Sequence, residues 1–330
     1  MFIKLAKSQN AIIAYVYLAF CAIGFRISVF FTEPVFGFQN SYPSPFSELV
    51  VWGIDFFSIN DSLIIWIAIF SIYIQAIWIN FIVNKHVVLY RKSFLTALLF
   101  LLLNCLFVEQ LFLTPLLIAN FFLIPLLDKL LSVYDTNKPI SLSFDVGLLL
   151  CIASLFYFPV VVFLILAVIA FIAFTTSQLK QWFSFIIGFG LPIFFMGFYY
   201  FWIDDLSGLN TIYQNYEWTF FSMMYDLSVI QLILLGALAL LLLLALKSLA
   251  QNFHKNAIQV RKYHRFIILY AGISILSMLI FSIPIQLGLV ILTIPLSVLL
   301  SYYFLIQKKL LIPELLFIAV LGLTVYCQVS

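Results

Sequence analysis

Long runs of apolar residues, separated by short polar segments, constrain this chain more than any other feature. There are eleven such runs, and most approach the roughly 20 residues that a helix needs to cross a hydrocarbon core of about 30 Å. None alternates as barrel strands do, and backbone groups in lipid must bond within their own segment. The sequence therefore predicts an all-α polytopic membrane protein with about eleven transmembrane helices. The predicted spans lie near residues 11–31, 62–83, 94–108, 111–128, 143–158, 159–175, 183–203, 227–246, 266–283, 285–306 and 313–329.

The share of charged residues excludes a soluble fold. Of the 330 residues, 9% are charged and 65% are hydrophobic, whereas ordinary globular domains carry about 25% charged residues. The net charge of +3 does not indicate a nucleic-acid partner. The four cysteines lie singly within apolar runs, so their spacing predicts neither a disulfide framework nor a thiolate metal site. We expect one transmembrane bundle over residues 1–330, surrounded by membrane lipids.

The distribution of charged residues predicts the orientation of the bundle. Lys and Arg near span ends collect on the cytoplasmic side of a membrane. With eleven spans and a cytoplasmic N-terminus, every Lys and Arg except Arg26 falls on that side. The C-terminus is then predicted to lie outside. Most acidic residues fall on the outer side, namely Glu33, Glu48, Asp55, Asp61, Glu109, Asp204, Asp205, Glu217 and Asp226.

Two long segments, residues 32–61 and 204–226, form most of the predicted outer surface. Residues 44–58 combine a broad apolar stripe with acidic positions, which predicts a helix lying in the membrane interface. The second segment is rich in tyrosine, tryptophan and phenylalanine, which favours another interfacial helix. Interfacial helices are thus predicted in the first and fourth outer loops. On the cytoplasmic side, the basic loop 247–265 is sufficient to fix the topology and could also attract anionic headgroups.

Arg26 is the candidate ligand for an anionic substrate. A guanidinium keeps its charge when partly buried and presents forked donors that match phosphate oxygens. Glu33 follows in the same outer segment and is the candidate catalytic base, which would take a proton from an acceptor hydroxyl. The structural alternative is that Arg26 extends to the lipid headgroups or forms an ion pair.

Further candidate substrate-binding residues come from the predicted outer side. Glu48 and Asp55 lie in the predicted interfacial helix, and Glu109 falls at the tip of two short spans whose outer ends could be buried. Trp218 could stack on a sugar ring, although aromatic residues also concentrate at membrane interfaces. No metal site is predicted, because all the histidines fall in predicted cytoplasmic segments, and the sequence identifies no cofactor. These histidines are His86, His254 and His264.

Several short motifs recur in a recognisable order over most of the chain. They are Phe144, Asp145 and Gly147, the run from Ala153 to Pro159, then Trp182, Gly188, Pro192 and Tyr199-Tyr200, and finally residues 255–265 and Ile294-Pro295. Together they resemble a family of uncharacterised multi-spanning inner-membrane proteins of Bacteroidota. The resemblance implies a multi-pass protein of the bacterial inner membrane and implies no particular activity.

The order of predicted elements is similar to that of the C-type glycosyltransferases. Both have a cytoplasmic N-terminus, a long acidic first outer loop with an interfacial helix, and short hairpins thereafter. Those enzymes take sugars from polyprenyl-phosphate donors and use an acidic residue of the first outer loop as base. The similarity implies that Glu33, or else Glu48 or Asp55, would be the base and that Arg26 would face the phosphate.

Three kinds of function remain open from the sequence. The leading hypothesis is a C-type-like glycosyltransferase, or a non-catalytic relative, that binds a polyprenyl-phosphate-linked sugar at the outer leaflet. The alternative is a small-molecule or lipid transporter, for which Glu109 comes nearest to an ionisable residue within the membrane. A structural subunit that binds another membrane protein is the third hypothesis.

Overall fold

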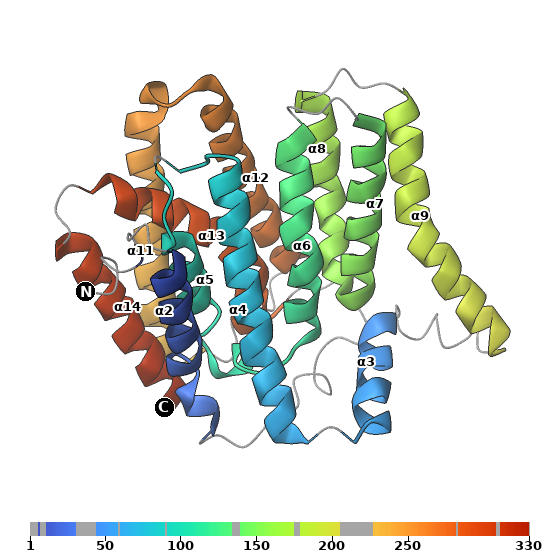
Figure 1. The fold of residues 1–330 in the computed structure, drawn as a ribbon, viewed down its shortest axis with the longest axis horizontal. Coiled ribbons are helices and arrows are strands. Elements are labelled where there is room, and N and C mark those ends of the chain that lie inside the picture. The colour runs from blue at the N-terminus through green and yellow to red at the C-terminus, as the bar shows by residue number, and fades with distance from the viewer. Residues whose placement is uncertain are drawn as a thin grey trace.

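The computed structural model describes most of the chain. The described residues are 6, 11–30, 44–58, 60–89, 91–133, 139–174, 179–204, 227–281, 283–307 and 311–329. Over this part of the chain the fold consists of helices and contains no strand (Figure 1). The α-helices are α2 (Ala11–Gly24), α3 (Pro45–Phe56), α4 (Asp61–Lys85), α5 (Leu95–Leu103), α6 (Pro115–Ser132), α7 (Pro139–Phe156), α8 (Leu164–Phe174), α9 (Leu179–Trp202), α11 (Val229–Asn252), α12 (Ile258–Ile280), α13 (Ile285–Ile306) and α14 (Leu311–Val329). Short 3-10 helices, named η, are η1 (Ile27–Phe30), η2 (Val108–Gln110), η4 (Phe158–Phe163) and η5 (Phe253–Lys255).

Within the described residues, nine helical segments are long and apolar enough to cross a membrane. They are Ala11–Val29, Ser62–Lys85, Pro115–Ser132, Pro139–Phe156, Leu179–Trp202, Val229–Asn252, Ile258–Ile280, Ile285–Ile306 and Leu311–Gln328. The prediction of a polytopic helical membrane protein is therefore confirmed. The orientation of its termini stays a prediction.

The predicted count of eleven spans is not confirmed, because two predicted spans correspond to shorter helices. In the first, residues 94–108, the helix α5 has only nine residues, which is a rise of about 13 Å. The chain leaves the helix at Asn104 and enters a buried turn. In the second, residues 159–175, the apolar segment is Phe158–Ile172. It begins as the 3-10 helix η4, in which Pro159 provides no backbone N–H.

Helices also extend beyond the apolar runs that predicted them. Helix α12 begins at Ile258, well before the predicted start at residue 266, because long basic side chains can extend to the headgroups from a continuing helix. His264 consequently lies inside a helix of spanning length and is buried, contrary to the expectation that every histidine lies between spans. Its Nε2 is 3.0 Å from the carbonyl oxygen of Val88, and its ring packs against that of Tyr302.

Helix α13 forms the core of the bundle. All of its residues from Gly288 to Leu305 are buried, and α5, α6, α11 and α12 pack against it. A helix that is apolar on every side is expected to lie in the core of its protein. The hydroxyls of Thr293, Ser297 and Ser301 donate to carbonyls one turn earlier in the same helix, so this burial leaves them hydrogen-bonded.

A helix is present within residues 44–58, as predicted, and is named α3; we call the end of the bundle where it lies the α3 end (Figure 1). Ser44 is its N-cap and Pro45 its first residue. The backbone N–H of Ser47 donates to Ser44 Oγ, and the N–H of Ser44 donates to Ser47 Oγ. This reciprocal capping fixes where the helix starts. Its position in the membrane interface stays a prediction.

Candidate functional site

An apolar groove between α7 and α9, next to the start of α3, is the candidate functional site. The cavity has a volume of about 440 Å³. Its walls are formed by Leu148 and Ile152 of α7, Leu191, Pro192, Phe195, Met196, Tyr199 and Tyr200 of α9, and Pro45 and Phe46 of α3. Among the described residues of this lining, the two tyrosine hydroxyls are the only oxygen- or nitrogen-containing side-chain groups.

Two glycines set the point where α7 and α9 touch. A Cβ atom added to Gly147 would lie 2.3 Å from the carbonyl oxygen of Phe185, and one added to Gly188 would lie 2.3 Å from that of Phe144. Real Cβ atoms do not approach backbone this closely, so only glycine allows the contact. Small residues are used in the same way where membrane helices pack closely.

Beyond this crossing the two helices separate and the groove opens. Pro192 lies inside α9, one turn after Gly188, and a proline inside a helix removes a backbone hydrogen bond and favours a bend. Figure 1 shows the C-terminal half of α9 leading away from the other helices. The buried positions of α9 include Gly188, Pro192, Met196 and Tyr200, which form a single stripe at helical spacing. This stripe faces α7 at the crossing and lines the groove beyond it.

The start of α3 closes one side of the groove. Ser44 Oγ donates a hydrogen bond of 2.6 Å to the carbonyl oxygen of Phe156, the last residue of α7. The ring of Phe46 packs edge-on against the ring of Phe156, with centroids 5.2 Å apart. The C-terminal carbonyl of α7 thus anchors the start of α3, and the side chains of Pro45 and Phe46 complete the wall.

The composition of the groove limits what it can bind. Ligand pockets of proteins usually measure about 300–1,000 Å³, and this volume is within that range. A charged or strongly polar ligand would lose its hydration and find few hydrogen-bond partners in the described lining. A hydrocarbon chain, in contrast, can enter from lipid at no such cost. The geometry therefore fits a lipid chain.

Arg26, the predicted phosphate ligand, lies away from this groove and is buried, with an exposed fraction of 1%. Its Nη1 donates to the carbonyl oxygen of Leu111 at 2.8 Å, and its Nη2 to those of Gln110 at 2.6 Å and Asn104 at 3.4 Å. These carbonyls belong to the turn between α5 and α6, which includes the 3-10 helix η2. Among the described residues, no carboxylate lies within ion-pair distance of Arg26. The guanidinium therefore satisfies backbone acceptors that the interrupted helix leaves unpaired.

Two glutamines complete the polar contacts around this turn. Gln328 of α14 donates to the carbonyl oxygens of Phe25 and Cys105 and accepts from the hydroxyl of Ser28. Gln110 donates to the carbonyl oxygen of Gln286 and accepts from the backbone N–H of Leu106. The ends of α2, α5 and α14 are thereby joined. Irregular backbone at membrane depth is tolerated only when protein surrounds it in this way.

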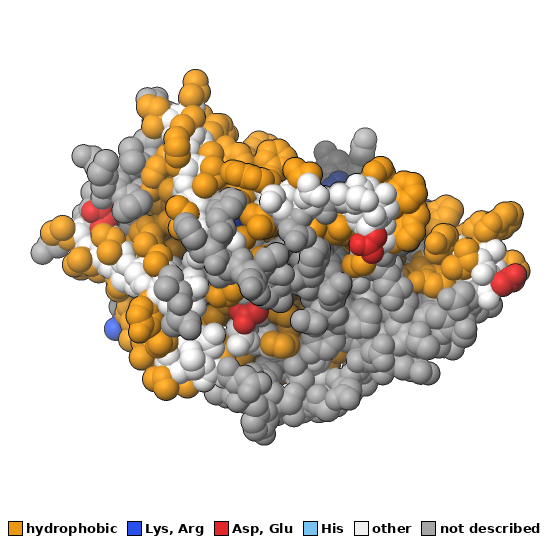
Figure 2. All heavy atoms as spheres, turned by 90° about the horizontal axis from the view of Figure 1, so that it is seen from below, with side chains coloured by type: hydrophobic (Ala, Val, Ile, Leu, Met, Phe, Trp, Pro, Cys, Tyr) orange, Lys and Arg blue, Asp and Glu red, His pale blue; other side chains and the backbone are white. Residues whose placement is uncertain are grey.

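Within the part of the chain that the structure describes, the other predicted site residues do not cluster around Arg26. Asp55 is exposed on α3, and Glu109 is exposed in the turn whose carbonyls bind Arg26. Glu48 lies in α3, but the structure does not describe its side chain. Glu33 and Trp218 lie outside the described residues. Figure 2, a view of the face at the α3 end, shows acidic side chains at several separate places.

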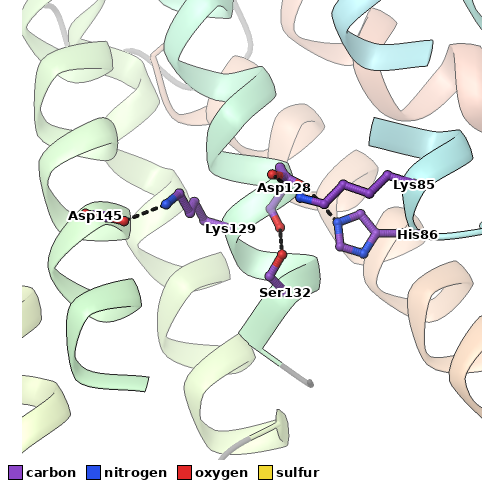
Figure 3. A network of polar contacts seen from close by, with 6 residues as sticks. All are labelled: Lys85, His86, Asp128, Lys129, Ser132 and Asp145. Atoms are coloured by element: carbon purple, nitrogen blue, oxygen red, sulfur yellow. Dashed lines mark hydrogen bonds and ion pairs between the residues drawn. The ribbon is translucent and has the colours of Figure 1, made fainter. Parts of the chain in front are cut away.

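A second polar cluster lies at the opposite end of the bundle (Figure 3). Lys85 Nζ lies 2.9 Å from Asp128, and His86 Nε2 lies 2.6 Å from the same carboxylate. Lys129 forms an ion pair with Asp145. These contacts join α4 to α6 and α6 to α7. Because these contacts link neighbouring helices, we assign the cluster a structural role. Lys85, Lys129 and Asp145 are partly exposed, and such ion pairs individually contribute little to stability.

The sequence interpretation missed the groove, although some of its residues had been noted. Gly147, Gly188, Pro192 and the Tyr199-Tyr200 pair belong to the motifs that resemble a Bacteroidota family, and in the structure they form the crossing or the wall. The available signal was a glycine in each of two neighbouring apolar runs, followed in the second run by a proline. That pattern predicts a close contact that opens into a gap.

The fold and the groove together define an integral membrane protein built as a multi-pass helical bundle. More particularly, the chain belongs to a family of unknown function, DUF6427, whose family model matches residues 7–330. No curated protein and no solved structure matches the chain. An origin in Bacteroidota and the similarity to C-type glycosyltransferases stay predictions.

Proposed function

We propose that this protein binds a polyprenyl-phosphate-linked lipid at the outer leaflet of the bacterial inner membrane, with the lipid chain in the groove between α7 and α9. The observation that carries the proposal is the apolar cavity of about 440 Å³, formed in the half of the two helices nearest α3. The predicted topology assigns that end to the outer side. A chain bound there would leave its phosphate and sugar near the α3 end.

Lipid binding without catalysis is the form of the leading hypothesis that the geometry supports best. Glycosyl transfer would additionally require a base, for which Glu33 remains our candidate. The acceptor hydroxyl would give its proton to the Glu33 carboxylate while its oxygen bonds to the anomeric carbon of the sugar. The bond between that carbon and the phosphate oxygen would break, releasing polyprenyl phosphate.

Transport is favoured less, although one feature of the fold suits it. The helix α5 stops within the bundle, and broken helices whose free carbonyls bind ions are typical of transporters. Here Arg26 already donates to the carbonyl oxygens of Asn104, Gln110 and Leu111. An ion would have to displace a resident cation.

The proposal is tested by filling the groove. In Leu191→Trp, the indole would occupy the cavity that Leu191 lines. The matched control is Ile193→Trp, because Ile193 has a similar exposed fraction, 42% against 37% for Leu191, and does not line the cavity. Full-length protein in detergent would be exposed to a photoreactive polyprenyl phosphate and the covalent adduct measured.

We expect Leu191→Trp to reduce labelling about tenfold and Ile193→Trp to leave it near the wild-type level. A fragment analysis of the wild-type adduct should find label on α7 or α9. If wild type takes up no label, or if Leu191→Trp and Ile193→Trp are labelled to the same extent, the groove does not bind this lipid and the proposal is wrong.

A further inference from the structure

The connection between α11 and α12 brings two arginines over one aromatic ring. Helix α11 ends at Asn252, and Phe253 opens the 3-10 helix η5. From the first turn of α12, the guanidinium carbon of Arg261 lies 5.8 Å from the centre of the Phe253 ring. That of Arg265, one turn further on, lies 5.0 Å from it. A ring in this position attracts each cation and restricts both side chains.

The two guanidiniums retain unused donors. No described residue accepts a hydrogen bond from Arg261 or Arg265 or forms an ion pair with either. Arg261 Nε is buried and without a hydrogen-bond partner, whereas Arg265 is exposed. Residues 247–265 contain three lysines besides these arginines and no acidic residue. The connection is therefore strongly basic.

The position of this connection indicates which anion is available. It joins two helices of membrane-spanning length at the end of the bundle opposite α3 (Figure 1). Residues at the end of such a helix lie at the depth of the headgroups. An anionic phospholipid presents a phosphate at that depth, and its acyl chains lie beside the apolar surfaces of the two helices. Guanidinium forks match phosphate oxygens in geometry as well as charge.

We propose that Arg261 and Arg265, held over Phe253, form a binding site for the phosphate of an anionic phospholipid headgroup. The site is separate from the groove and does not depend on the function proposed for it. It differs from the ordinary excess of basic residues on the cytoplasmic side, because that excess requires only charge. A phosphate site with a defined geometry requires the forked donors of the two guanidiniums and the Phe253 ring that holds them in place.

The test separates geometry from charge. Full-length protein would be titrated in detergent with phosphatidylglycerol or phosphatidylcholine, and bound lipid would be counted by native mass spectrometry. The double variant Arg261→Lys with Arg265→Lys keeps both positive charges and loses the two bidentate guanidinium groups. Phe253→Leu keeps both arginines and removes the ring. Arg91→Lys, at an exposed arginine of another connection, is the control.

We expect wild type and Arg91→Lys to bind phosphatidylglycerol in preference to phosphatidylcholine. Affinity should fall about tenfold in the double lysine variant, because the bidentate hydrogen bonds of the two guanidiniums are lost although both charges remain, and less in Phe253→Leu. Equal affinity of wild type and the double lysine variant would show attraction by charge alone and overturn the proposal. Displacement of the lipid by inorganic phosphate at the same concentration would also overturn it, because the site would then recognise the free anion.

Discussion

At the scale of single residues, Arg26 illustrates how a buried charge can serve a fold. A cation in a lipid-surrounded bundle is a candidate functional residue by default. In the structure its terminal nitrogens bond three backbone carbonyls, one at the end of α5 and two further along the connection to α6. The sequence separations are 78, 84 and 85 residues, so no local pattern could reveal these partners. Its role as a phosphate ligand stays a prediction, and the structural role is the one that the contacts support.

The structural role predicts a large effect on stability. Arg26→Met would leave three buried carbonyl oxygens without donors, and each unpaired buried acceptor costs roughly 1–3 kcal/mol. We expect the free energy of unfolding to fall by about 3 kcal/mol or more and the melting temperature to fall with it. The control is Arg91→Met, at an exposed position. A variant at Arg26 that loses lipid binding but melts like wild type would instead support the phosphate role.

At the scale of elements, the pair α7 and α9 defines the shape of the candidate site. Their contact depends on two glycines, and their separation follows a proline in one of them. Helix α9 packs closely against α7 and has many exposed apolar side chains elsewhere. The groove is thus a local property of two helices and the start of α3.

Substitution of the crossing glycine should force these helices apart. In Gly188→Ala the new methyl group would meet backbone of Phe144 at 2.3 Å, and overpacking of this kind typically costs about 1–3 kcal/mol. Gly190→Ala is the matched control, since a Cβ atom there meets nothing within 4 Å. We expect Gly188→Ala to lower the melting temperature and Gly190→Ala to leave it unchanged or raise it slightly. Equal melting temperatures of the two variants would contradict the close crossing of α7 and α9.

The helices that could be predicted from sequence are those whose apolar runs exceed the length of a span. Helix α13 is an example, because its predicted and observed bounds agree at residues 285–306. Helix α5 could not be predicted, since the apolar residues after Leu103 continue through a buried turn and give no sign that the helix has ended. The contact of Gly147 with Gly188 was equally hidden, because it depends on how two spans cross.

At the scale of the whole molecule, the orientation in the membrane stays a prediction that can be tested directly. Asp55 lies at the α3 end and Arg91 in the connection after α4, and both are exposed. All four native cysteines are buried, so they should contribute little background in cysteine labelling. In spheroplasts, a membrane-impermeant maleimide should label Asp55→Cys directly and Arg91→Cys only after permeabilisation. Labelling in the reverse order would mean that the predicted topology is inverted.

The central position of α13 has a consequence for biogenesis. Helices α2 to α12 leave the ribosome before it, and chains are generally synthesised and folded from the N-terminal side. The helix around which they pack is therefore missing while they enter the membrane. Until Ile285–Ile306 is inserted, the earlier helices can hold only a provisional arrangement, and their final packing has to wait for one late segment.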